Sequence, residues 1–137
     1  MMENRKVRLG LIGCGMIARV KHMKGVAAHS DEVEVVAFCD LIEERAVNYA
    51  KAYGAQGAKV YTDYKELLKD ATIDAVIVAT PNRSHSFITI DSLEADKHVL
   101  CEKPMAKTYA EGKAMLDAAK RTGKILTIGY QNRYRND

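Results

Sequence analysis

The fold of this chain is decided by one stretch, GLIGCGMIA at residues 10–18, which joins an apolar run of strand length to a helix. Gly13 allows a tight turn, Gly15 lets the main chain approach a ligand without a Cβ in the way, and Ala18 keeps the helix close to the sheet. The amides of Met16 and Ile17 are then expected to point at phosphate oxygens, with the helix dipole adding favourable charge. The stretch predicts a pyrophosphate-binding turn.

An acidic residue follows the second apolar run. Asp40 lies 22 residues beyond Ala18, where a carboxylate can accept hydrogen bonds from both hydroxyls of an adenosine ribose. A carboxylate there repels a 2′-phosphate, and Leu41 and Ile42 follow it instead of an arginine, so NAD is predicted in preference to NADP. Arg45, one helical turn further on, keeps NADP open, and Asp40 can alternatively serve as the N-cap of the second helix.

Short apolar runs alternate with longer segments of helical period along the whole chain. The strand candidates are residues 7–12, 33–39, 59–61, 75–79, 98–101 and 125–129. The helix candidates are residues 16–29, 42–53, 64–69, 84–95 and 109–122. Strands that are apolar almost throughout are typical of a parallel sheet covered on both faces. Right-handed crossovers then predict an α/β fold, a doubly wound parallel six-stranded sheet of the Rossmann order 3-2-1-4-5-6.

Helix ends carry their expected chemistry. Asp63 with Glu66, and Thr108 with Glu111, have the spacing of capping boxes. Gly54 and Gly123 fall just past helix ends, where left-handed residues are expected.

Composition excludes several classes of function. The 137 residues are 47% hydrophobic and 28% charged, and a formal net charge of +3 with scattered Lys and Arg gives no stripe for nucleic acid. No apolar run is long enough to cross a membrane, and residues 1–8 lack the apolar core of a secretion signal. Cys14, Cys39 and Cys101 cannot all pair with one another, which favours a reducing cytoplasmic compartment, and no metal site is predicted.

Polar clusters follow the last three predicted strands. They are Thr80-Pro81-Asn82-Arg83-Ser84-His85, Glu102-Lys103-Pro104 and Tyr130-Gln131-Asn132-Arg133-Tyr134. Ligands of an open parallel sheet bind beyond the carboxyl ends of its strands. The three clusters are therefore expected to converge on the far end of a ligand held at the glycine-rich turn.

These motifs resemble the N-terminal domain of the glucose-fructose oxidoreductase and inositol dehydrogenase family, often written Gfo/Idh/MocA. The matching elements are residues 10–15 with Ala18 and His22, Cys39-Asp40, residues 79–82 with His85, Glu102-Lys103-Pro104, and residues 129–131 with Arg133-Tyr134. They cover essentially the whole chain in the family's order. The Glu-Lys-Pro tripeptide is the most specific of them, because generic Rossmann domains lack it.

The resemblance implies a role for each matching residue. Thr80, Pro81 and Asn82 would line the middle of the cofactor, with His85 near the nicotinamide ribose and Glu102 on its hydroxyls. Lys103 would be the catalytic residue, reaching both cofactor and substrate oxygen, since an ammonium stabilises alkoxide character as hydride leaves. Gln131 and Arg133 would border the cofactor and the domain junction.

A purely structural role is the alternative for several of these residues. Glu102 and Lys103 can be a solvated pair, His85 an ordinary early-helix histidine, and residues 131–133 the start of a linker. His22 is expected to be structural.

The resemblance also implies a larger protein. Residues 1–130 are predicted to form the NAD(P)-binding domain and residues 131–137 to begin a linker to a C-terminal α/β domain that carries most of the substrate pocket and the oligomer interface. This chain is then expected to be a fragment that binds dinucleotide weakly, self-associates through uncovered apolar surface and turns over no substrate. Its parent is expected to be a homo-oligomer.

Three functions follow from these residues. The leading prediction is an oxidoreductase domain that moves hydride between nicotinamide and a sugar, inositol or related polyol. The second is a nucleotide-binding or regulatory module without catalysis. The third, an S-adenosylmethionine-dependent methyltransferase, shares the glycine-rich turn and the acid but is disfavoured by the Glu-Lys-Pro and Thr-Pro-Asn clusters.

Overall fold

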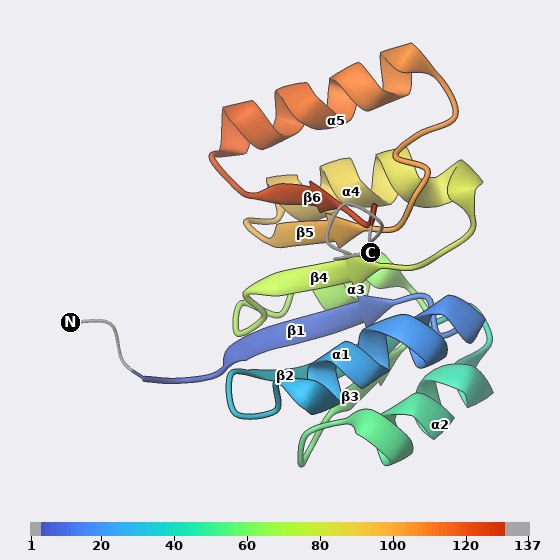
Figure 1. Cartoon of the computed structure of the whole chain (residues 1–137), viewed down its shortest axis with the longest axis vertical. Coiled ribbons are helices and arrows are strands. Elements are labelled where there is room, and N and C mark those ends of the chain that lie inside the picture. Colours follow the sequence, from blue (N-terminus) through green and yellow to red (C-terminus); the bar gives the residue numbers. More distant parts are fainter. Residues whose placement is uncertain (1–3, 131–137) are drawn as a thin grey trace, which may run out of the picture.

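The computed structural model describes residues 4–130, which form a single parallel sheet with helices on both faces. The sheet has six strands in the order β3-β2-β1-β4-β5-β6, and all its arrows point toward the same edge in Figure 1. All five strand pairings are parallel. The predicted fold class and strand order are confirmed.

The elements begin and end within a residue or two of their predicted bounds. The strands are β1 (Val7–Ile12), β2 (Val33–Cys39), β3 (Lys59–Tyr61), β4 (Ala75–Val78), β5 (His98–Cys101) and β6 (Leu126–Ile128). The helices are η1 (Ala18–His22), α1 (Met23–Ala28), α2 (Glu43–Tyr53), α3 (Tyr64–Leu68), η2 (Asn82–Ser84), α4 (His85–Glu94) and α5 (Tyr109–Thr122). No helix within residues 4–130 is long and apolar enough to cross a membrane.

The first helix is not a uniform α-helix as predicted. Its segment η1 (Ala18–His22) is a π-helix, which continues directly into α1. Wide turns of this kind are rare and are often found at functional sites. Helical periodicity in a sequence does not distinguish them from α-helix, because both present an apolar face to the sheet.

The predicted caps are confirmed in part. Gly123 is left-handed, with φ +70°, but Gly54 is extended, with φ −76°, so the prediction of a left-handed Gly54 was wrong. Close packing explains that glycine instead, because a Cβ there would lie 2.6 Å from the Ala50 carbonyl oxygen and 2.8 Å from the Ala58 Cβ.

Neither predicted capping box closes in both directions. Thr108 accepts from the Glu111 amide as expected, at 3.1 Å, but the Glu111 carboxylate reaches back to the Lys107 amide rather than to that of Thr108. Asp63 accepts from the Lys65 amide, and the Glu66 carboxylate pairs with Lys69 instead. Each N-cap residue is correct, while the carboxylate that would make the reciprocal bond accepts from a different donor.

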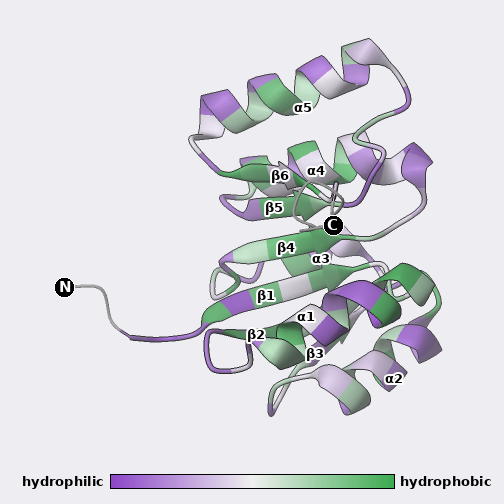
Figure 2. Cartoon of the chain, viewed as in Figure 1, coloured by the Kyte–Doolittle hydropathy of each residue, from purple (hydrophilic) through white to green (hydrophobic). Residues whose placement is uncertain are grey.

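Each face of the sheet has its own apolar core. On one face α1 and α2 cover Leu11, Val35, Phe38 and Ile77. On the other, α3, α4 and α5 cover a second cluster that includes Val76. Figure 2 shows the result as hydrophobic strands in the middle and hydrophilic residues along the outer helices. Burial on both faces is what makes these strands apolar throughout.

The strand order reverses between β1 and β4. The chain passes from β1 to β2 and β3 on one side, and from β4 to β5 and β6 on the other. Open sheets of this kind bind ligands at that reversal, beyond the carboxyl ends of the strands.

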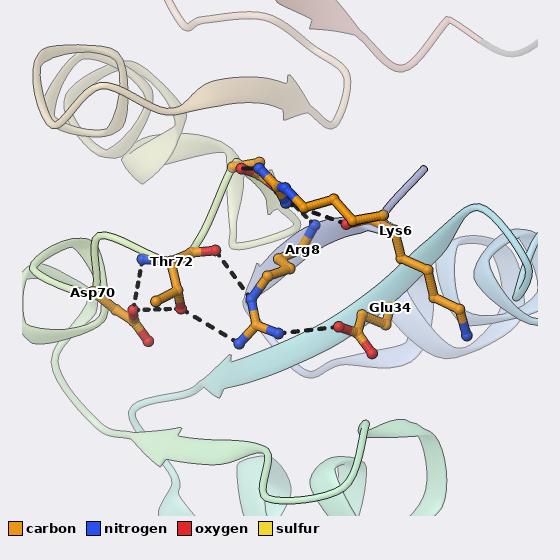
Figure 3. A network of polar contacts seen from close by, with 7 residues as sticks. Lys6, Arg8, Glu34, Asp70 and Thr72 are labelled. Carbon is orange, nitrogen blue, oxygen red and sulfur yellow. Dashed lines mark hydrogen bonds and ion pairs between the residues drawn. The ribbon is translucent and has the colours of Figure 1, made fainter. Parts of the chain in front are cut away.

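The opposite, amino-terminal edge is held together by a polar network. Arg8 donates to Glu34 at 3.1 Å and to the Thr72 carbonyl at 3.1 Å, and Thr72 in turn donates to Asp70 (Figure 3). Asp74 accepts two bonds from the Arg5 guanidinium and one from the Arg8 amide. The network ties the start of β1 to β2 and to the segment before β4. Its role is therefore structural.

Replacing Asp74 by Asn is expected to lower the free energy of unfolding by about 1–2 kcal/mol at pH 7, with solvent around the half-exposed Arg5 screening part of the effect. Hydrogen bonds from Arg5 hold the pKa of Asp74 at about 2. The folded-state pKa thus lies below the unfolded one, so the stabilisation is present above about pH 4 and is lost as the pH falls toward 2. Urea unfolding at pH 7 and pH 3 measures the difference.

The matched control is Asp31→Asn, which changes an exposed carboxylate in the turn before β2. It is expected to leave the unfolding free energy within about 0.5 kcal/mol at both pH values. A deficit for Asp74→Asn that is equally large at pH 3 and pH 7 would contradict the assignment.

Candidate dinucleotide-binding site

The turn after β1 is confined on both sides by the neighbouring strands. Gly13 has φ +100°, and its amide donates to the Cys39 carbonyl at 2.8 Å. A Cβ on Gly13 would lie 2.7 Å from the carbonyl carbon and oxygen of Ala79. Only glycine fits both the conformation and the space at this position.

The next glycine faces open space. A Cβ on Gly15 would meet no atom within 4 Å, among the described residues, other than its chain neighbours. Met16 and Ile17, which begin the helix, are 72% and 40% exposed. The first amides of a helix have no partner within it, so they are available to an anion at this surface. An uncovered main chain at a helix start fits the phosphate groups of a dinucleotide.

Asp40 holds the glycine-rich turn from the end of β2. Its Oδ2 accepts from the Cys14 amide and its Oδ1 from the Ile42 amide, both at 2.9 Å. The N-cap residue of α2 is Ile42, so Asp40 does not take the alternative role of capping that helix. A carboxylate offers about four acceptor positions. Two are used by the described part of the chain, and within it the others remain for hydroxyl donors.

Tyr49 supports the same turn from α2, which the sequence analysis missed. Its hydroxyl donates to the Gly15 carbonyl at 2.5 Å, and its ring packs edge-on against Phe38 and Tyr53. Burial raises the pKa of Tyr49, which keeps the hydroxyl a donor. The helical spacing of residues 46, 49 and 53 indicates a buried face, but nothing in it points to the turn.

Cys14 lies in the turn without chemical activity of its own. The side chain is buried, and its Sγ lies 3.6 Å from the Cys39 carbonyl oxygen. Burial, with the nearby charge of Asp40 second, raises the pKa of Cys14 to about 12. A thiol with that pKa is uncharged at neutral pH and is a poor nucleophile.

The loop after β4 presents part of the predicted site to solvent. Pro81 and Asn82 are exposed, and Thr80 is half-buried. Ser84 Oγ lies 2.7 Å from Thr80 Oγ1 and 2.8 Å from the Pro81 carbonyl oxygen, which fixes the loop as it enters η2. Since the loop follows β4 at the carboxyl edge, it lies at the same edge of the sheet as the glycine-rich turn.

His85 is buried beneath two of the predicted site segments. It is 2% exposed, its Nε2 lies 2.8 Å from the Thr80 carbonyl oxygen, and its Nδ1 lies 2.8 Å from that of Pro104. The ring therefore links the loop after β4 to the loop after β5. Its predicted contact with a cofactor stays a prediction, because both nitrogens are engaged within the protein.

Glu102 and Lys103 differ in their surroundings although they are neighbours. Glu102 is 7% exposed and lies 2.7 Å from the Nε2 of His22, whereas Lys103 is exposed. Among the described residues, no hydrogen bond or ion pair engages the Lys103 ammonium. The alternative of a solvated Glu-Lys pair thus fails for Glu102, and Lys103 is available to a ligand.

The structure brings most of the predicted residues to one edge. The turn at residues 13–17, Asp40, the loop at residues 80–82 and the Glu102-Lys103 pair all follow the carboxyl ends of β1, β2, β4 and β5. Gln131 lies outside the described residues. Within residues 4–130 no three His, Cys, Asp or Glu side chains are grouped as metal ligands.

A parallel sheet of this order, with a glycine-rich turn at its reversal and a carboxylate after β2, defines a dinucleotide-binding Rossmann domain. Residues 7–130 match the family described as "Oxidoreductase family, NAD-binding Rossmann fold", that is, Gfo/Idh/MocA. The chain belongs to this family, as the resemblance predicted. Membership favours an oxidoreductase domain over the methyltransferase alternative.

Two curated relatives are named for a polyol or a sugar substrate. The chain is 36% identical to an inositol 2-dehydrogenase of Salmonella typhimurium over 93% of its length, and 35% identical to a D-glucoside 3-dehydrogenase of Escherichia coli over 99%. It spans 38% of the length of each.

Solved structures of the family superpose closely on this chain. The WlbA dehydrogenase of Bordetella pertussis, in complex with NADH and UDP-GlcNAcA, matches 96% of the chain with TM-score 0.88 and 36% identity, over 39% of its own length. KijD10, a 3-ketoreductase of Actinomadura kijaniata in complex with NADP, matches 96% with TM-score 0.88 and 27% identity, again over 39% of its own length. Relatives solved with NADH and with NADP thus share this fold.

Proposed function

We propose that this domain binds NAD(H) across the carboxyl edge of its sheet and serves an oxidoreductase that acts on a sugar, inositol or related polyol. The observation that carries the proposal is the open face of Gly15 beside the confined Gly13. The turn itself requires Gly13, whereas no contact within the described residues requires a glycine at position 15. The uncovered main chain there suits a pyrophosphate bound by amides.

The preference for NAD over NADP rests on Asp40. Its carboxylate is held by two amides and has acceptor positions left for two ribose hydroxyls. A 2′-phosphate in the same place would meet its negative charge. Asp40 therefore favours a ribose without phosphate, while exposed Arg45 opposes that preference from the first turn of α2.

Lys103 is the proposed catalytic residue. The nicotinamide ring supplies or accepts the hydride when it is bound. The exposed ammonium of Lys103, at the carboxyl end of β5, would lie against the substrate oxygen and stabilise the charge that develops there as its proton leaves. Glu102 beside it is proposed to hold the adjoining ribose. The substrate class comes from the named relatives, which act on inositol and glucosides.

Gly15→Ala is expected to weaken NADH binding at least about tenfold, because the added methyl group would occupy the face where the pyrophosphate lies. It should leave the thermal midpoint nearly unchanged, since a Cβ there meets no other part of the described chain. Titration by NADH fluorescence, followed by thermal unfolding of the same samples, measures both.

Gly25→Ala is the matched control, because its Cβ also meets no atom within 4 Å but lies in α1, after the turn. It should bind NADH as the unchanged domain does. Equal binding by the two variants would refute a pyrophosphate at Gly15.

The proposed selectivity is tested through Asp40. The unchanged domain is expected to bind NADH at least about tenfold more tightly than NADPH, and Asp40→Asn should narrow that ratio to about threefold or less. The ratio is the informative quantity, because loosening of the turn would weaken both ligands alike. Isothermal titration with both coenzymes provides it.

Glu44→Gln, an exposed change of the same kind in the first turn of α2, should leave the ratio unchanged. The assignment to Asp40 is wrong if its own variant preserves the ratio.

A further inference from the structure

His22 and Glu102 form a buried pair between elements that are far apart in the chain. His22 ends η1, and Glu102 follows the last residue of β5. Nε2 of the histidine lies 2.7 Å from Oε1 of the glutamate, and the two side chains are 11% and 10% exposed. Most ion pairs of this domain are far more exposed, such as His29 with Glu32 at 65% and 69%. Burying a histidine and a glutamate costs free energy unless their mutual geometry is good and further hydrogen bonds engage their other polar atoms.

The direction of the hydrogen bond follows from the chemistry of its partners. An ionised carboxylate only accepts, so the proton lies on Nε2 of His22. The other oxygen, Oε2, accepts from the Lys103 amide at 3.1 Å. Each oxygen of Glu102 is therefore fixed by a different element, one by the first helix and one by the loop that carries Lys103.

Gly129, the residue after β6, lies beside the Glu102 carboxyl group. A Cβ added to Gly129 would come within 3.4 Å of Cδ and Oε1 of Glu102. With His22 on one oxygen and the Lys103 amide on the other, rotation of the carboxylate is restricted. Within residues 4–130, two of its roughly four acceptor positions are used, and two are left.

The pair also joins elements from the two sides of the reversal in strand order. The first helix begins at the glycine-rich turn, β5 lies beyond β4 in the sheet, and the reversal of strand order lies between β1 and β4. A dinucleotide that starts at the turn and extends over the end of β4 would meet Glu102 next. The hydroxyl pair of its second ribose offers two donors to the two remaining acceptor positions.

We infer that His22 is a positioning residue: it holds the Glu102 carboxylate so that its remaining acceptors receive the two hydroxyls of the ribose next to nicotinamide. The inference rests on the proposed function. His22 is then expected to contribute to the binding of one half of the ligand only, the half that carries the ribose next to nicotinamide. A role in packing alone would not produce such a difference between the halves.

Three ligands distinguish the two halves of the dinucleotide. ADP lacks the second ribose, whereas ADP-ribose and NADH both have it. His22→Leu removes the donor and is expected to weaken ADP-ribose and NADH about five- to twentyfold, with ADP changed less than about twofold. His22→Gln keeps an N–H near the position of Nε2 and should restore both to within about threefold of the unchanged domain. Calorimetric titration of the whole chain gives all nine constants.

Two controls accompany the series. His29→Leu removes the histidine of the exposed pair and should change none of the three affinities. In a Glu102→Gln background, His22→Leu should weaken the binding of ADP-ribose and NADH by less than about twofold further, because the carboxylate that His22 positions is already altered. If His22→Leu does not fold, His22→Asn, too short to reach Glu102, takes its place with the same expectation.

The outcomes are distinguishable. If the unchanged domain binds none of the ligands, the proposed function is wrong and the inference falls with it. If it binds all of them while His22→Leu weakens ADP as much as NADH, or weakens neither, the proposed function stands and the positioning role is overturned.

Discussion

The site depends on one constraint, the confinement of Gly13 between its two neighbouring strands. Its amide is bonded to Cys39 of β2, and its α-carbon faces the main chain at Ala79, just past β4, leaving no room for a side chain. The chain must therefore turn sharply away from β1 at the point where the strand order reverses. Asp40 and Tyr49 then hold the rest of the turn from β2 and α2. The result is a rigid main chain with an open face at Gly15.

The same edge gathers the groups that a ligand would meet further along. His85 lies between the loop after β4 and the loop after β5, with one ring nitrogen 2.8 Å from a carbonyl oxygen of each. His22 fastens the first helix to Glu102. The two histidines thus connect the first helix with the loops after β4 and β5, and exposed Lys103 lies in one of these connected loops. The polar network around Arg8 and Asp74, which has a structural role, lies at the opposite edge of the sheet and involves none of these groups.

Much of this was predictable because local patterns determine it. Apolar runs such as residues 33–39 indicate strands buried on both faces, and the turn at residues 13–18 orders the sheet around them. Contacts across the fold were not. The His22–Glu102 pair joins residues 80 positions apart, and Tyr49 reaches Gly15 across 34. No periodicity encodes such distances. The lack of room for a side chain at Gly54, where a Cβ would lie 2.8 Å from Ala58 and 3.0 Å from Phe38, likewise follows from contacts in the folded chain.

The central claim is that the uncovered amides after Gly15 hold the phosphates of a dinucleotide. Amide resonances recorded during titration of the labelled chain with NADH test this residue by residue. We expect saturable shifts at Met16 and Ile17, together with Asp40, and unchanged resonances at Asp74 and Thr72 on the opposite edge. Shifts confined to that opposite edge, or amides of the turn that do not respond at saturating coenzyme, would contradict it.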